Sequence, residues 1–163
     1  MTTFPPSEKD AHSLTLSAAI RLPCREGTLS LEGIVQRVGG ETGAAALQRL
    51  VEFIDREGPR ALARVEGDFV ALFQVRDHIH AFKSFTSQYQ IYYREADGLV
   101  SNRLFAFWDR ATGQWDDDYF ARHVLIVPGY QFLSRDTPIK GVVRVLPGEL
   151  VSLGARVERQ QPV

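Results

Sequence analysis

Residues 127–153 read VPGYQFLSRDTPIKGVVRVLPGELVSL, and this order of turns and short apolar runs restricts the fold more than any other stretch of the chain. An apolar helix is expected to end at Pro128-Gly129, because these two residue types interrupt helices and favour turns. A turn follows at Asp136-Thr137, and a tight Pro147-Gly148 turn then leads into a predicted strand over residues 149–153. The stretch therefore predicts a helix, a capped turn and a strand in close succession.

Alternating apolar and polar residues predict strands ahead of this stretch. Residues 13–20 and 28–35 both alternate, as strands with one buried face do. The turn at residues 25–27 joins them into an antiparallel hairpin with Cys24 at its bend. Further along the chain, four short strands are expected to form a meander, over residues 69–75, 79–83, 89–94 and 99–101.

Helical periodicity predicts the other elements. Thr42 is a suitable N-cap for a helix whose apolar residues recur every three or four positions until Gly58. A second helical turn over residues 59–65 follows, and residues 104–108 predict a short buried helix that is rich in aromatic side chains. The run Asp116-Asp117-Asp118 opens an amphipathic helix. The helix dipole favours carboxylates at this end, so the acidic run does not require a metal ion.

Composition limits the classes of protein to which the chain can belong. Its 163 residues are enough for one hydrophobic core, which we assign to residues 13–156 between a flexible tail, 1–12, and a polar tail, 157–163. A content of 44% apolar residues and a net charge of −1 indicate a globular protein that does not bind nucleic acid. The sequence has no apolar run long enough for a membrane span and no export signal, which predicts a cytoplasmic protein without a membrane partner.

Short motifs spread over residues 41–153 carry a resemblance to a known family. In chain order they are Glu57-Gly58-Pro59, Gly67-Asp68-Phe69-Val70-Ala71, Gln90-Ile91-Tyr92-Tyr93, Val100-Ser101-Asn102 and the closing turns quoted above. Together they resemble the glutaminase domain of asparagine-synthetase-like enzymes, which include asparagine synthetases, β-lactam synthetases and lasso peptide cyclases. The resemblance implies an α+β fold of the N-terminal-nucleophile (Ntn) hydrolase type. This is an αββα sandwich of antiparallel sheets flanked by helices, here reduced at the N-terminus.

The resemblance also implies that glutamine hydrolysis has been lost. Active members of this class II glutamine amidotransferase family use a cysteine exposed as residue one, whose own α-amine, with a pKa near 8, serves as the base in place of a lysine. This chain has Thr2 after its first methionine, Leu31-Glu32-Gly33 in place of the Asn-Gly that binds the oxyanion, and alanines at 44–46 in place of the aspartate that holds the substrate amine. Residues 83–87 replace a conserved RDxxG turn of those enzymes. The resemblance therefore implies no catalytic residue and no cofactor.

Several side chains remain candidates for a site. Thr2, or Cys24 after proteolytic cleavage of the chain, is an alternative N-terminal nucleophile. Phe85 and Tyr89 lie in a predicted loop and, with Asn102, are the candidates for substrate binding.

Histidine and cysteine side chains are the remaining candidates for metal ligands. His78 and His80 stand two apart on one face of a predicted strand, a spacing that two metal ligands can share. No third ligand is identifiable, so no metal is predicted. Cys24 is the only cysteine, which excludes an internal disulfide and a cysteine-built zinc site.

We therefore expect a non-catalytic glutaminase-like domain that acts as a binding or scaffolding subunit in a biosynthetic pathway. Its partner would be a separate asparagine-synthetase-like amidoligase or peptide cyclase chain, or the peptide substrate of that chain. A homodimer is also expected, because loss of the N-terminal strand would leave a sheet edge unpaired. Two alternatives stay open: an active amidohydrolase that uses Thr2 or processed Cys24, and an excised domain of a larger ATP-dependent amidoligase.

Overall fold

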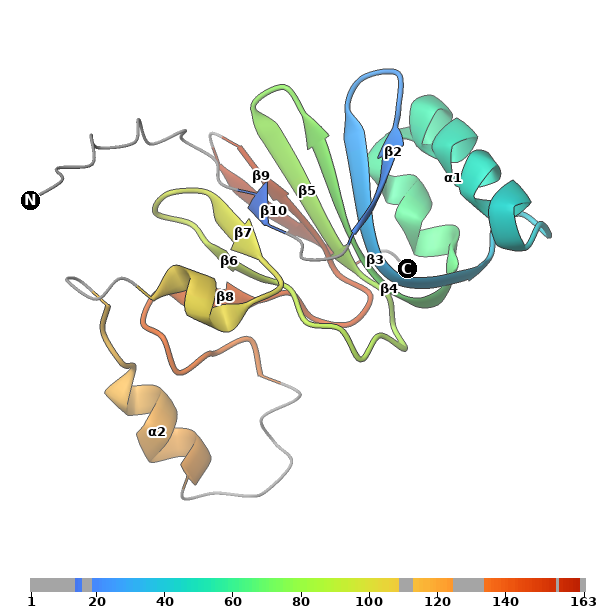
Figure 1. Ribbon diagram of the computed structural model, residues 1–163. Helices are drawn as coiled ribbons and strands as arrows, with labels where there is room; N and C mark the ends of the chain where they lie inside the picture. The colour runs from blue at the N-terminus through green and yellow to red at the C-terminus, as the bar shows by residue number, and fades with distance from the viewer. Residues whose placement is uncertain (1–13, 16–18, 109–112, 125–133, 155, 162–163) are drawn as a thin grey trace, which may run out of the picture.

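The computed structural model describes residues 14–15, 19–108, 113–124, 134–154 and 156–161. Two β-sheets pack against each other in it (Figure 1). Helix α1 (Gly43–Glu57) and the 3₁₀ helix η1 (Gly58–Arg64) cover part of the outer face of the larger sheet. This arrangement of sheets and helices confirms the predicted α+β class.

The larger sheet contains six antiparallel strands in the order β10-β9-β5-β4-β3-β2. In chain order these are β2 (Ile20–Pro23), β3 (Thr28–Arg37), β4 (Glu66–Val75), β5 (His78–Lys83), β9 (Leu150–Leu153) and β10 (Val157–Gln160). The predicted hairpin at Cys24 is present as β2–β3, but its first strand is Ile20–Pro23 and not residues 13–20, because Leu14–Thr15 pair in the other sheet. Its turn is closed by a hydrogen bond from the Cys24 amide to the carbonyl of Gly27, 2.9 Å long.

The last strand, β10, differs from the sequence prediction. A polar tail is predicted from residue 157, but Val157–Gln160 pair with β9 at one edge of the larger sheet. Polar side chains hold this strand in place, because Arg159 donates a hydrogen bond to the Tyr93 hydroxyl (2.8 Å) and pairs with Glu95. The folded domain therefore extends beyond residue 156.

The smaller sheet has the order β1-β7-β6-β8. It consists of β1 (Leu14–Thr15), β7 (Leu99–Ser101), β6 (Tyr92–Arg94) and β8 (Val142–Arg144). Strand β1 runs parallel to β7, so the prediction of purely antiparallel sheets is wrong for this pair.

The predicted four-strand meander is also wrong, because β4 and β5 belong to the larger sheet while β6 and β7 belong to the smaller one. Residues 84–91 cross between the sheets instead of starting a strand at Tyr89. A turn at the beginning of this crossing explains the difference: the Ser84 amide donates to the Phe69 carbonyl and the Ser87 amide donates to the Ser84 carbonyl.

Strand register sorts the apolar side chains into two layers. Alternate residues of β3 and β4, among them Leu31 and Phe73, pack in a core beneath α1. The intervening residues of β4, Val70 and Leu72, pack with Tyr93 of β6 in a second core between the two sheets. Successive strand residues point to opposite faces, so polar residues that share a face with Val70 also lie on the inner face of the sandwich.

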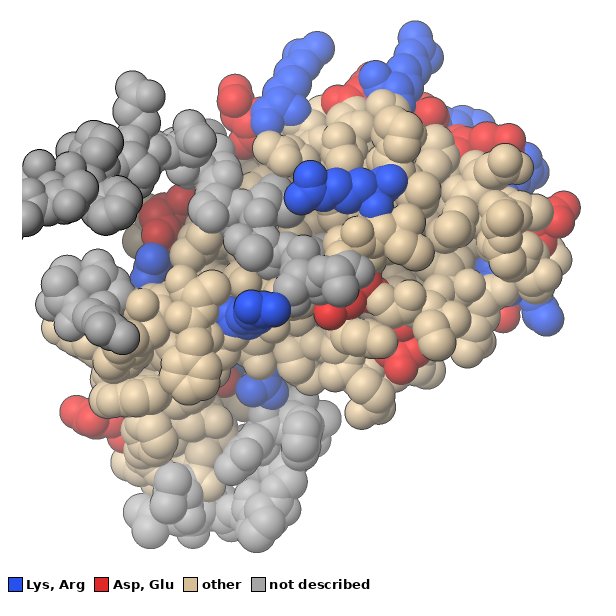
Figure 2. Space-filling model, in the orientation of Figure 1, with Lys and Arg blue, Asp and Glu red and all other residues tan. Residues whose placement is uncertain are grey.

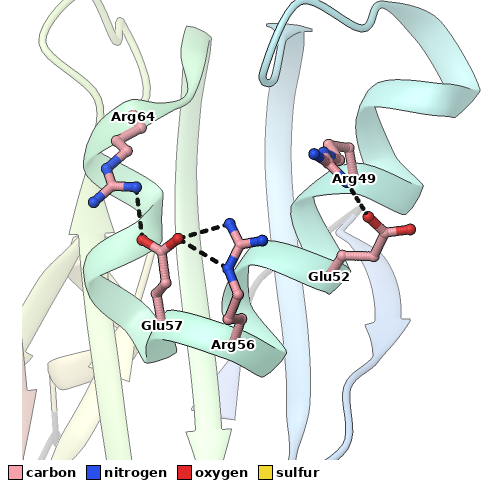
Figure 3. Close-up of polar contacts among 5 residues, drawn as sticks. All are labelled: Arg49, Glu52, Arg56, Glu57 and Arg64. Atoms are coloured by element: carbon pink, nitrogen blue, oxygen red, sulfur yellow. Dashed lines mark hydrogen bonds and ion pairs between the residues drawn. The ribbon is translucent and has the colours of Figure 1, made fainter.

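Helix α1 confirms the prediction from periodicity. It ends at Gly58, which has a φ of 73° and donates its amide to a carbonyl one turn earlier. Thr42 is the N-cap residue, but its side chain makes no capping hydrogen bond. Figure 3 shows Glu57 between Arg56 and Arg64, at 2.8 and 2.7 Å, and the pair with Arg64 joins the end of α1 to the end of η1.

The aromatic segment after β7 forms a single 3₁₀ turn, η2 (Leu104–Phe107). Phe107 is buried, but Phe105 is 72% exposed, so the prediction of a buried helix is wrong for this residue. Helix α2 (Asp117–Val124) starts after Asp116, whose Oδ1 accepts a hydrogen bond from the Tyr119 amide at 2.9 Å. The acidic run is therefore a helix start, as predicted. The helix end predicted at Pro128-Gly129 lies outside the described residues.

The closing stretch contains the predicted turns, and polar side chains join its parts to one another. Thr137 Oγ1 donates a hydrogen bond to the Val142 carbonyl, 2.8 Å long. Glu149, just before β9, is fully buried, pairs with Arg135 at 2.5 Å and accepts a hydrogen bond from the Leu146 amide at 2.9 Å. The glutamate of the closing motif thus joins the loop ahead of β8 to the start of β9.

Charged side chains are mixed on one face of the molecule. On the face shown in Figure 2, basic and acidic side chains are interspersed, with broad uncharged areas between them. Within the described residues, no helix has both the length and the apolar character that a membrane crossing requires.

Candidate functional site

Of the two alternative nucleophiles, only Cys24 belongs to the part of the chain that the structure describes. Thr2 lies outside the described residues. Cys24 lies in the β2–β3 turn and packs against the core beneath α1. Burial, and then the carboxylate of Asp55, raises the pKa of the Cys24 thiol, which is the opposite of what a cysteine nucleophile requires.

The loop of residues 84–91 is fixed to the start of β4 at one end of the sandwich. Ser84 Oγ and Thr86 Oγ1 both donate to the Gly67 carbonyl, at 2.8 and 2.9 Å. The Gln88 amide donates to Asp68 Oδ1 at 3.0 Å. These bonds hold the loop across the end of the larger sheet, so the aromatic residues in it have a defined position.

Phe85 and Tyr89 lie at this end of the sandwich, and both side chains are exposed. The Phe85 ring lies over Gly148, where an added Cβ would come within 2.3 Å of Cζ. The Tyr89 ring lies against Gly33 of β3, where an added Cβ would be 2.9 Å from Cε2. Exposed fractions are 71% for Phe85, 37% for Tyr89 and 63% for Ile34, the residue after Gly33. We call Ile34, Phe85 and Tyr89 the mouth surface.

Asn102 joins the two sheets next to this surface. Its Nδ2 donates to Glu32 Oε2 of β3 at 2.5 Å. Tyr89 contacts Gly33, the next residue along β3, so the structure brings Tyr89 and Asn102 to consecutive residues of one strand. The three predicted binding residues therefore occupy the same end of the molecule.

Lys83, at the end of β5, is a residue of this site that the sequence reasoning missed. It lies opposite Val70 in the β4–β5 ladder and so faces the inside of the sandwich, where it is 3% exposed. Its ammonium donates to Gln90 Oε1 at 3.1 Å. Among the described residues, no carboxylate lies within ion-pair distance of it.

The electrostatic setting of Lys83 changes its chemistry. Burial, and then the positive charge of Arg144, lowers its pKa from 10.5 to about 8, while Asp68 acts in the opposite direction. An amine with this pKa is partly neutral near neutral pH, unlike an ordinary lysine. The sequence gives little indication that Lys83 is buried. Its inward orientation follows from its pairing with Val70 across the β4–β5 ladder, which only the structure shows.

Replacing Lys83 with methionine is expected to raise the free energy of unfolding by about 2 kcal/mol at pH 7. The folded-state pKa, about 8, lies below the value of 10.5, so the unfolded chain holds the proton more tightly. The buried ammonium therefore costs stability below pH 8, and this cost disappears as the pH rises from 8 to 10.5. Urea denaturation of both proteins at pH 7 and pH 10 should show a large difference only at pH 7.

Lys140→Met is the matched control, because Lys140 is exposed. It is expected to change the free energy of unfolding by less than about 0.5 kcal/mol at either pH. A Lys83→Met gain of the same size at pH 7 and pH 10 would contradict the assigned pKa.

His78 and His80 lie elsewhere, on the face of the larger sheet that α1 covers in part. Within the described residues, no group of three or more potential His, Cys, Asp or Glu ligands could hold a metal ion. The two histidines line a separate cavity with Ser152, which is considered below.

Comparison with known proteins gives distant structural similarity alone. No protein-family model and no curated protein matches the chain. Among solved structures, glutamine phosphoribosylpyrophosphate (PRPP) amidotransferase from B. subtilis, in complex with ADP and GMP, is similar to it with a TM-score of 0.41 and 12% sequence identity. The match covers 89% of this chain and 31% of that protein, so the chain spans less than a third of the length of this relative.

Proposed function

We propose that this chain is a non-catalytic glutaminase-like domain that binds a segment of a partner protein at the mouth surface. The observation that carries the proposal is the grouping of Ile34, Phe85 and Tyr89, all exposed, on a loop and strand that are fixed by side-chain hydrogen bonds. Exposed apolar groups on a rigid support are typical of interaction sites, since little conformational entropy is lost on binding.

The residues at the positions of the glutaminase machinery support a role without amide hydrolysis. Leu31, in place of the oxyanion-binding asparagine, is buried in the core beneath α1. Glu32 places a carboxylate near the inter-sheet end, and a negative charge there would repel a developing oxyanion. Cys24 lies on the α1 side of the larger sheet, whereas Glu32 shares the inner face of the sheet with Val70.

The partner that fits the proposal is a separate amidoligase or peptide cyclase chain, or the peptide that such a chain processes. Apolar side chains of the partner would contact Phe85 and Tyr89. The edge strands β2 and β10 of the larger sheet provide a second type of contact, because an edge strand can pair with another chain. A homodimer formed through such an edge is part of the proposal, with a cytoplasmic location.

Purified protein is expected to release no ammonia from glutamine above the rate of a heat-denatured sample. Cys24→Ala and Thr2→Ala should leave this baseline unchanged, because neither residue acts as a nucleophile in the proposed function. Mass spectrometry of the first residue would show whether processing exposes Thr2 or Cys24. Glutamine-dependent ammonia release that disappears in either variant would exclude the non-catalytic role.

Binding is tested by co-expression with a synthetase or cyclase chain encoded beside this one. Phe85→Ala combined with Tyr89→Ala should weaken capture of that chain at least tenfold, as the loss of two aromatic contacts predicts. Phe105→Ala is the matched control, because Phe105 is equally exposed but belongs to η2. Equal losses in both variants would argue against the mouth surface, and a monomeric mass with no captured chain would argue against the proposed function as a whole.

A further inference from the structure

A row of polar side chains crosses the larger sheet on the face that α1 covers in part. His80 of β5 lies opposite Phe73 of β4, whose side chain belongs to the core beneath α1. Ser152 of β9 lies opposite His80, and Glu158 of β10 lies opposite Ser152. Opposite residues of neighbouring strands share a face, so His80, Ser152 and Glu158 stand side by side beyond the part of the sheet that α1 covers (Figure 1).

The hydroxyl of Ser152 and the imidazole of His80 are in direct contact. Ser152 Oγ lies 2.8 Å from His80 Nδ1, within the distance at which a histidine accepts the proton of a serine nucleophile. The His80 ring packs against Phe73, with ring centroids 6.2 Å apart. Because both residues lie in paired strands and not in a loop, their relative position is fixed by the backbone.

This pair faces an open cavity. A cavity of about 350 Å³ is lined by His78, His80, Ser152, Arg156 and Glu158. A neighbouring hollow shares both histidines and adds Glu26, Val75, Arg76 and Asp77. The first cavity has room for a small ligand next to Ser152, and Arg156 supplies a positive charge on its wall.

We propose that Ser152 and His80 form a nucleophile and base pair that accepts an acyl group from small activated esters. Ser152 Oγ forms a bond to the ester carbonyl carbon while His80 takes the hydroxyl proton. The carbon–oxygen bond to the leaving alcohol then breaks, and His80 returns the proton to that alcohol. Water releases the acid from Ser152 in a second step with the same base, so the Ser152 hydroxyl is restored.

The surrounding charges have definite roles in this step. The backbone amides of β9 are used in the sheet, so the guanidinium of Arg156 is the group that balances negative charge on the carbonyl oxygen. The carboxylate of Glu158 favours the protonated imidazole that forms after proton transfer, and the carboxylates of Glu26 and Asp77 in the neighbouring hollow act in the same direction. The positive charges of Arg156 and Arg76, and a protonated His78, disfavour it. Burial, and then His78, lowers the pKa of His80, so the imidazole is neutral and ready to act as a base at pH 7.

Reaction of the folded protein with a fluorophosphonate probe tests the proposal, with peptide mass spectrometry to locate the label. The label is expected on Ser152. Labelling should be about a hundredfold slower in His80→Gln, the size of effect that loss of a general base produces. Hydrolysis of p-nitrophenyl acetate should show an initial burst that Ser152→Ala removes. Ser134→Ala, a serine outside the cavity, should label and hydrolyse as the unchanged protein does.

Several outcomes would overturn the proposal. The probe could label only serines other than Ser152, or it could label Ser152 as fast in His80→Gln as in the unchanged protein. The burst of ester hydrolysis could also persist in Ser152→Ala. If His80→Gln does not fold, the pH dependence of the unchanged protein decides, since labelling of Ser152 must fall as His80 gains a proton, and the lowered pKa of His80 places this fall below pH 6.5. A labelling rate that stays constant from pH 8 down to the lowest pH at which the protein remains folded would count against His80 as the base. This site is separate from the mouth surface, so the outcome is independent of the proposed binding function.

Discussion

Replacing Glu149 with alanine is expected to lower the free energy of unfolding by about 2 to 4 kcal/mol, because it removes a buried acceptor from the Leu146 amide and from Arg135, which is partly exposed and so regains some hydration. The Glu149 side chain is fully buried, with one oxygen 2.5 Å from Arg135 and the other accepting the Leu146 amide at 2.9 Å. Its removal deprives both donors of their acceptor and leaves a cavity beside β9. Urea denaturation with a fluorescence readout at pH 7 would measure the loss.

An exposed ion pair provides the matched control for this variant. Glu66 pairs with Arg37 at 3.6 Å, and more than half of each side chain is exposed. Glu66→Ala is therefore expected to change the free energy of unfolding by less than about 1 kcal/mol, because water solvates both groups after the pair is lost. Similar losses in Glu149→Ala and Glu66→Ala would show that burial of Glu149 does not determine its contribution.

The elements that the sequence predicted correctly are those whose pattern is local. The β2–β3 hairpin follows from alternation around a turn, and α1 follows from apolar spacing that ends at Gly58. The pattern fails where a long-range partner decides. Residues 157–160 are mostly polar, yet they form an edge strand that pairs with β9. Arg159 of this strand binds Tyr93 and Glu95, which lie more than 60 positions earlier in the chain.

The division of the predicted meander has the same kind of cause. Residues 89–94 have strand composition, but the Ser84 turn and its bonds to β4 direct the chain toward the other sheet. Ile91 then interacts with the segment after β8, since its carbonyl accepts the Val145 amide. A partner more than 50 positions away in the sequence decides where this strand lies, and alternation alone carries no information on that partner.

The candidate site was predictable to a similar extent. The sequence placed Phe85 and Tyr89 in a loop, but it did not predict their exposure, because aromatic side chains between two strands more often pack in a core. Lys83 was missed because its pKa depends on burial between two sheets whose pairing the sequence does not show. The contact of His80 with Ser152 was also missed, because it joins residues 72 positions apart.

Replacing Gly33 with alanine is expected to lower the free energy of unfolding by about 3 kcal/mol or more. Gly33 has a φ of 113°, which side chains rarely adopt, and an added Cβ would lie 2.2 Å from the Asp68 carbonyl oxygen and 2.8 Å from Phe69 Cα. These atoms belong to the neighbouring backbone of β4, so they cannot move aside without breaking strand pairing. The same Cβ would displace Tyr89, so partner binding at the mouth surface should weaken as well.

Gly40→Ala separates backbone strain from this close contact. Gly40 also has a positive φ, 91°, but no atom lies within 4 Å of an added Cβ. Its substitution is therefore expected to cost only the strain of that conformation, about 1 to 2 kcal/mol. Thermal and urea denaturation of both variants would give the difference, which measures the contact of Gly33 with β4. If the two variants lose equal stability, backbone conformation alone explains the effect of Gly33→Ala, and the close contact of Gly33 with β4 contributes nothing. The position of Tyr89 would then not depend on a glycine at position 33.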